Sequence, residues 1–108
     1  MRIATTDVIA GQQTVTTLGF VFGLAIRSRS LSGNIMAGLG SLGNGSALDE
    51  YRDDLAAVRR QAVAQMEGEA KGLGANAVVG VRFDAAEVGH DMSEIIAYGT
   101  AVVIEPDP

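Results

Sequence analysis

The chain has 108 residues, carries a formal net charge of −5 and contains no cysteine. This length suits one domain with one hydrophobic core, and an aromatic content of 5% means that Val, Ile, Leu and Ala must fill it. The acidic balance excludes a general nucleic-acid binder, because phosphate contacts need clustered Lys and Arg. Without cysteine there is no disulfide framework and no thiolate metal site, which suits a reducing cytoplasm.

No stretch predicts a membrane span or an export signal. The first residues, MRIATTDVIAG, carry Asp7 and lack a long apolar segment. The most apolar later run, LGFVFGLAI, has about half the length needed to cross a bilayer. We therefore expect a soluble protein that stays in the cytoplasm and has no membrane partner.

Alternating side chains predict three β-strands, at residues 14–27, 77–84 and 94–104. In the first strand, large residues define one face and small residues define the other. The large residues are Leu18, Phe20, Phe22, Leu24 and Ile26, and the small ones are Gly19, Val21, Gly23 and Ala25. A similar contrast returns in the other two strands, so both faces of the predicted sheet are largely apolar.

A long amphipathic helix is predicted between the first two strands. Apolar residues recur at steps of three and four from Leu48 through Val58, Ala62, Met66 and Ala70 to Leu73. The pattern predicts a helix of about 27 residues, roughly 40 Å long. Ser46 suits its N-cap, and Gly72 and Gly74 are the candidates for a left-handed cap at its end.

Two stretches are predicted to be irregular. Residues 31–45 combine helically spaced leucines with five glycines, which predicts a short weak helix and a loop. Their GLGSLG letters match a dinucleotide-binding pattern, but the strand before them ends about ten residues too early, so a flexible loop is the better interpretation. The final residues, EPDP, lack ladder donors at both prolines, so we assign 1–104 to one domain and 105–108 to a frayed acidic tail.

The predicted sheet has two apolar faces, and one helix can cover only one of them. We expect the helix to pack on the large face of the first strand. The small face, which holds Gly19, Gly23, Gly80 and Gly99, then needs another cover. A second copy of the chain is the simplest one, which predicts a symmetric homo-oligomer. Closure of the sheet into a barrel within one chain is the alternative.

Arg82 and Asp84 are the first candidate site residues. They lie two apart on the second predicted strand, so their side chains share a face, the small one expected to meet another subunit. They are candidates for ligand-binding or catalytic groups in a cleft between subunits. The alternative is an ion pair or rim contact that orients the interface.

The link between the last two strands holds a candidate metal site. Glu87, His90, Asp91 and Glu94 offer oxygen and imidazole ligands to one divalent ion. A hairpin tip is also where solvated charges normally lie, so a solvated turn is the alternative. His90 is the only histidine, and any acid–base triad would have to use it.

Several motifs resemble, in order and across nearly the whole length, those of the YbjQ family of small bacterial and archaeal proteins. They are TT at 5 and 6, LGFVFGLAIRSRS, LGANAVVGVRFD and SEIIAYGTAVVI. The resemblance implies a compact α+β unit, similar to dodecin subunits, that assembles into a ring, in known members a pentamer. For activity it implies only a family description, "putative heavy-metal-binding", without a ligand set. The stretch GNGSALDEY departs from the family, where a Gly-Gly pair usually precedes the helix.

These observations predict an α+β chain with an antiparallel sheet of about three main strands packed on one long helix, in a ring-forming homo-oligomer. The first functional hypothesis is a non-enzymatic module that binds a small ligand or another protein. The second is divalent or heavy-metal-ion binding near the last hairpin. The third is an enzyme that uses Arg82, Asp84 or His90 at a subunit boundary, and it ranks last because no nucleophile and base pair is visible.

Overall fold

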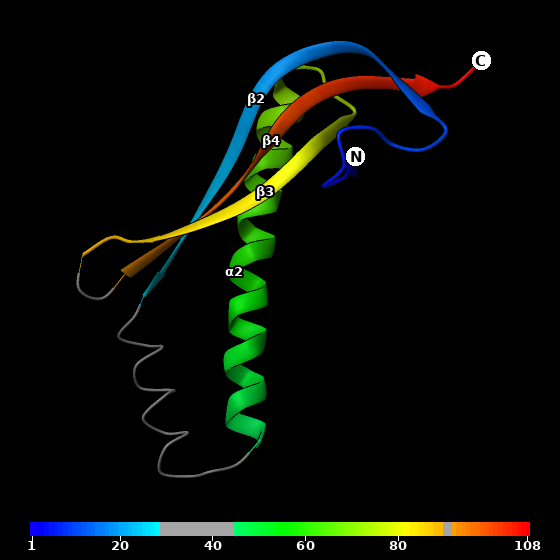
Figure 1. The fold of residues 1–108 in the computed structure, drawn as a ribbon. Coiled ribbons are helices and arrows are strands. Elements are labelled where there is room, and N and C mark those ends of the chain that lie inside the picture. The colour runs from blue at the N-terminus through cyan, green and yellow to red at the C-terminus, as the bar shows by residue number, and fades with distance from the viewer. Residues whose placement is uncertain (29–44, 90–91) are drawn as a thin grey trace.

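The computed structural model describes residues 1–28, 45–89 and 92–108. In chain order these residues form β1 (Arg2–Ile3), β2 (Gln12–Ser28), α2 (Gly45–Gly72), β3 (Ala77–Glu87) and β4 (Met92–Pro106). Figure 1 shows the three long strands as one twisted layer with α2 against one of its faces. The α+β class and the long helix are therefore confirmed. The predicted weak helix and the GLGSLG motif lie outside the described residues.

The sheet has four strands in the order β1-β3-β4-β2. The strand pairs β2–β4 and β3–β4 are antiparallel, whereas β1 runs parallel to β3. The sheet is therefore mixed, which corrects the prediction of an antiparallel sheet. The sequence could not reveal β1, because its two residues are too few to show alternation.

The helix packs on the small face of β2, so the prediction that it meets the large face is wrong. Val21, Gly23 and Ala25 are buried beneath the helix, while Phe20 and Phe22 point away from it and are 65% and 47% exposed. A Cβ built on Gly23 would fall on the carbonyl oxygen of Ala62 and 2.5 Å from the backbone nitrogen of Met66. The helix backbone comes this close because the strand has no side chain there.

Two irregularities in strand pairing change which side chains share a face. The register shifts between Thr17 and Gly19 in β2 and between Val79 and Arg82 in β3. In the second case Gly80 has a φ of 63°. Such a bulge adds one residue and breaks the alternation. Val78 and Val81 therefore both join the core under the helix, in contrast to the strict alternation predicted for residues 77–84.

The bulge glycine also corrects a prediction about the assembly. Gly80 was expected to admit a neighbouring subunit. Its N–H instead donates to the Thr6 carbonyl at 2.9 Å, and the Val81 N–H donates to the Ala4 carbonyl at 3.0 Å. The N-terminal segment of the same chain therefore occupies this edge of β3.

The main core lies between α2 and the sheet. The helix contributes Val58, Ala62, Met66 and Ala70, which confirms this part of the predicted stripe, whereas Leu73 at its end is 47% exposed. The strands contribute Val21, Ala25, Val78, Val81, Ala97 and Ala101. A second cluster packs around Ile9 of the N-terminal segment and consists of Ala77, Val79, Val102 and Ile104. The small residues of the main core let the helix lie close to the strands.

The helix also covers the free edge of β2. The Phe22 N–H donates to Oε2 of Glu69 at 3.2 Å, and the Leu24 N–H donates to Oε1 of Gln65 at 2.9 Å. An outer strand leaves every second N–H without a partner strand. Two side chains of α2 therefore satisfy donors that would otherwise be available to another chain.

Both ends of the helix lie close to their predicted positions. The helix begins at Gly45, one residue before the predicted N-cap Ser46. It ends before Gly74, which has a φ of 90° and donates its N–H to the Lys71 carbonyl at 3.0 Å. A positive φ at this position favours glycine, which confirms the predicted cap. Among the described residues, no helix combines the length and hydropathy needed to cross a membrane.

The C-terminal residues correct the prediction of a frayed tail. Strand β4 continues past Ile104, with Glu105 paired to Gln13 and Pro106 paired to Gln12. The Asp107 N–H then donates to the Gly11 carbonyl at 2.9 Å. Proline is tolerated at Pro106 because it is the last residue of the strand, where only one ladder donor is lost.

Candidate functional site

Arg82 ties the N-terminal segment to the sheet. Its Nη1 donates to the Thr5 carbonyl at 2.7 Å and to the Val81 carbonyl at 2.9 Å. Arg82 is opposite Tyr98 of β4, on the face of the sheet turned away from the helix. These two bonds give Arg82 a structural role that does not require a ligand.

Asp84 lies on the same face, opposite Ile96. Its Oδ1 accepts the N–H of Ala85 at 2.9 Å. Arg82 and Asp84 form no salt bridge with each other in the part of the chain that the structure describes. The predicted sharing of a face is confirmed, but it is the face of Phe22 and Tyr98 and not the predicted small face of Gly23 and Gly99. An ion pair between the two residues is not observed.

The structure separates two of the four candidate metal ligands. Ala86 pairs with Glu94, and Glu87 pairs with Ser93. Because successive side chains of a strand point to opposite faces, Glu87 and Glu94 lie on opposite faces of the hairpin. His90 and Asp91 lie outside the described residues. No group of three or more His, Cys, Asp or Glu side chains suited to a metal ion occurs among the side chains that the structure describes, in residues 1–27, 54–89 and 92–108.

Three aromatic side chains form an exposed cluster on the face of the sheet opposite the helix. We call Phe20, Phe22 and Tyr98 the aromatic face. The two phenylalanine rings stack with centroids 5.6 Å apart, and the Tyr98 ring lies 6.4 Å from that of Phe20. Tyr98 is 36% exposed, and Ile26, further along the same face of β2, is 55% exposed. These residues were recognised in the sequence as a large face, but they were expected to lie under the helix.

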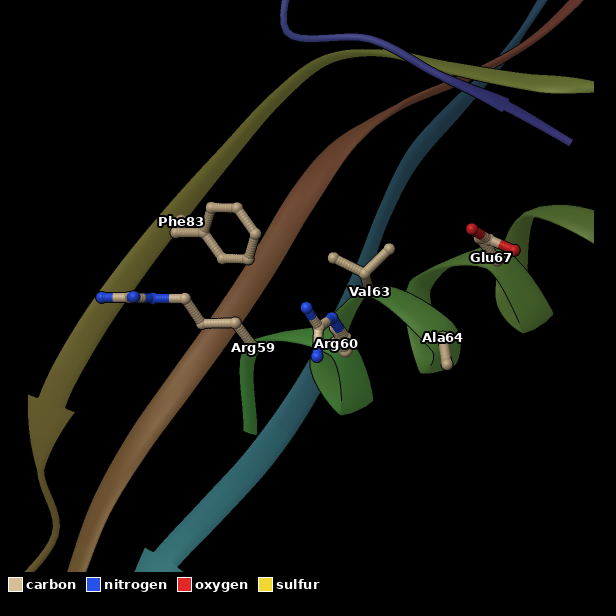
Figure 2. Close-up of a pocket in the computed structure, with 6 residues that line it drawn as sticks. All are labelled: Arg59, Arg60, Val63, Ala64, Glu67 and Phe83. Atoms are coloured by element: carbon tan, nitrogen blue, oxygen red, sulfur yellow. The ribbon is translucent and has the colours of Figure 1, made fainter. Parts of the chain in front are cut away.

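A groove lies on the other face of the sheet, between α2 and β3 (Figure 2). We call it the helix–β3 groove. It has a volume of about 350 Å³, and its lining comprises Arg59, Arg60, Val63, Ala64, Glu67 and Phe83. The sequence reasoning did not single out this site. The available signal was the pair of adjacent arginines beside the buried stripe of the helix.

The groove exists because the helix does not cover all of β3. Val81 is buried under α2, whereas Phe83, two residues further along the same face, is 47% exposed. Figure 2 shows Val63 and Phe83 on facing sides of the groove, with Arg59 extending from the helix toward β3. The groove therefore combines an apolar lining with two cationic side chains and one carboxylate.

Comparison with known proteins identifies the family. A family model described as "putative heavy-metal-binding" matches residues 1–105. A UPF0145 protein of Bradyrhizobium sp. is 47% identical over 106 residues, covering 98% of this chain and 95% of the relative. A UPF0145 protein of Methanoregula boonei is 46% identical over 105 residues, covering 97% and 87%.

The fold is similar to a solved structure. The crystal structure of a DUF74 family protein of unknown function from Pediococcus pentosaceus matches with a TM-score of 0.66 and 19% identity. The match covers 97% of this chain and 98% of that one. At this identity the likeness shows the fold alone. Since the family model and the relatives both cover nearly the whole chain, the chain belongs to the YbjQ family, whose relatives are called UPF0145 proteins.

Proposed function

We propose that the protein is a non-enzymatic, homo-oligomeric binding module whose subunits meet through the aromatic face. The observation that carries the proposal is the exposure of Phe20, Phe22 and Tyr98 as one cluster. The chain has only three phenylalanines and two tyrosines, so three of its five aromatic residues lie there. Exposed apolar clusters of this kind mark surfaces that another molecule covers.

A second copy of the chain is the partner that the surrounding charges favour. Arg82 lies opposite Tyr98, and Asp84 lies opposite the adjacent Ile96, so both signs of charge border the aromatic face. An identical partner also carries both signs of charge, so a contact between copies can place each sign near its opposite. A surface with one sign of charge would instead favour a partner of different composition.

A closed ring of five subunits is the form that we propose for this assembly. The resemblance to the YbjQ family, with subunits similar to those of dodecin, supports the ring and its size. Closed symmetry also limits growth, because every aromatic face is then covered and no open end remains. In this proposal the assembled ring binds a small ligand or another protein.

Native mass spectrometry of the full chain tests the assembly. We expect the wild type to give a mass of about 56 kDa, for five chains of 11.2 kDa each. The substitution Phe22→Asp should give monomers, because a buried carboxylate without a partner costs several kcal/mol. Phe22 is already 47% exposed in the single chain, so the variant should remain folded.

Val8→Asp is the matched control. Val8 is 70% exposed and lies outside the aromatic face, so the same change in size and charge should leave the mass unchanged. A wild type that remains monomeric at high concentration would disprove the proposal. An oligomer that survives Phe22→Asp would show that the subunits meet through another surface.

Binding of a divalent or heavy-metal ion is the second candidate function, and the family description supports it. The test is calorimetric titration of the metal-free protein with Zn²⁺, for the wild type and for His90→Ala. Loss of binding in the variant would support a site at the last hairpin, because imidazole is a preferred zinc ligand. Equal binding in both proteins, or none in either, would contradict it.

A further inference from the structure

The helix–β3 groove is on the opposite side of the sheet from the aromatic face. Phe83 lies on the same face of β3 as Val81, which packs under α2. Phe22 and Tyr98 lie on the other face. The aromatic face and the groove are therefore two separate surfaces of the chain, and they share no residue.

The charges of the groove are arranged along the helix. Arg59 and Arg60 lie at one end of the lining, and Glu67 follows about two helical turns later, or roughly 10 Å along the axis. Neither arginine forms a salt bridge with another described residue. Both are exposed, in a chain whose net charge is −5. This end of the groove is a local cationic site on an acidic protein.

The apolar part of the groove lies beside these cations. The Phe83 ring and the Val63 side chain face each other, and Ala64 adds a small apolar contact (Figure 2). Guanidinium groups present parallel N–H donors that match the two oxygens of a carboxylate or phosphate. An aromatic ring and a branched side chain offer a surface for a flat apolar group.

We infer that the helix–β3 groove binds a small amphiphilic anion. Its carboxylate or phosphate pairs with Arg59 and Arg60, and its flat apolar body lies against Phe83 and Val63. The volume of about 350 Å³ is within the range of small-molecule sites. This inference rests on the proposed binding role of the module, and it names the site and the ligand class.

Calorimetric titration of the full chain with three naphthalene compounds tests the inference. Naphthoate and naphthyl phosphate carry an anionic group on a flat apolar body, and naphthylmethylammonium carries a cationic one. We expect both anions to bind and the cation not to bind. The anion with the higher affinity identifies the preferred head group.

Substitutions of the residues that line the groove are expected to change the affinity for the anion in different directions. Replacing both Arg59 and Arg60 by Gln should weaken anion binding at least about tenfold, which is the typical loss for one charge-assisted pair. Glu67→Gln should strengthen it, because a carboxylate repels an anion. Phe83→Ala should weaken binding without changing the charge, which separates the contribution of the apolar contact.

The pair Arg2→Gln and Lys71→Gln is the control. It removes the same charge as the double arginine variant, but both residues line a different cavity near the end of the helix. An equal loss of affinity in this control would show that net charge alone attracts the anion, and would overturn the site. Binding of the ammonium compound, or of none of the three compounds, would also overturn it.

The same variants separate this inference from the proposed assembly. Phe22→Asp should abolish the oligomer and leave anion affinity unchanged. If the double arginine variant instead loses the oligomer, a neighbouring subunit occupies the groove and the ligand site is disproved. Intact assembly with no anion binding would reject the groove and retain the proposed assembly.

Discussion

Gly23 lies at a close approach of β2 and α2, and its missing side chain determines which face of the strand the helix covers. A methyl group there would meet the backbone of Ala62 and Met66, which cannot move without shifting the helix. Gly99 of β4 is constrained by a different element, since a Cβ there would lie 2.9 Å from the Val79 carbonyl oxygen of the adjacent strand β3. The glycine at position 23 therefore allows the helix to approach the sheet, and the glycine at position 99 leaves room for the bulged part of β3.

The first prediction is that Gly23→Ala lowers the free energy of unfolding by about 3 kcal/mol, because the overlap is with backbone atoms. Urea unfolding at one fixed protein concentration measures it. Gly68→Ala is the matched control, since no atom lies within 4 Å of its added Cβ. This control should raise stability by about 1 kcal/mol through helix propensity. Equal effects of the two substitutions would contradict the close approach.

Arg82 is the residue for which a structural and a functional role are most easily confused. Its guanidinium bonds to the Thr5 carbonyl and so holds the N-terminal segment beside β3. The N–H groups of Gly80 and Val81 bond to the same segment. A ligand-binding role would leave these backbone bonds independent of the Arg82 side chain.

We expect Arg82→Gln to increase amide hydrogen exchange at Gly80 and Val81, because the segment that accepts their bonds loses its side-chain anchor. The cost in stability should be about 1 kcal/mol. Asp84→Asn is the control, since its amide oxygen can still accept the Ala85 N–H. Unchanged exchange in Arg82→Gln would remove the structural role and favour a ligand-binding one.

At the scale of elements, α2 acts both as a core layer and as an edge cover. Its buried stripe packs on the sheet, while Gln65 and Glu69 accept N–H groups from the outer strand β2. Strand edges without such partners pair readily with other chains. The helix thus leaves the aromatic face of the sheet exposed and closes part of its edge.

The double substitution Gln65→Leu and Glu69→Leu should lower stability by about 2 kcal/mol, because two strand donors lose their acceptors. Amide hydrogen exchange at Phe22 and Leu24 should become faster, and nuclear magnetic resonance measures it. Gln65→Glu with Glu69→Gln keeps an acceptor at both positions and should preserve protection. If these two amides exchange at the same rate in the double leucine variant as in the wild type, the two hydrogen bonds do not protect the edge.

At the scale of the whole molecule, the chain is more extended than a compact domain of its length. Its radius of gyration is 17.4 Å, compared with about 13 Å expected for 108 residues. The long strands and the helix form two layers (Figure 1). Several large apolar side chains, among them Phe20, Phe22 and Ile26, are exposed outside the core. The aromatic face is the largest aromatic part of this exposed apolar surface, which is why the proposed assembly uses it.

Much of the fold could be predicted because its signals are local. Alternation indicated β2, β3 and β4, and the spacing of Val58, Ala62 and Met66 indicated the buried side of the helix. The helix–β3 groove was harder to predict from the sequence. Phe83 and Arg59 are 24 positions apart in the sequence, and only the packing of α2 beside β3 brings them to one groove.

The sequence by itself determined the α+β class, the three long strands, the extent of the helix and its glycine cap, because periodicity and glycine conformation act over a few residues. Only the tertiary structure decided which sheet face the helix covers. Burial of large side chains favoured one face, but close backbone approach at Gly23 required the other. The tertiary structure also decided the pairing of β1 and the bulge at Gly80, since both depend on contact between the N-terminal segment and β3. These are contacts between distant segments, which no local pattern records.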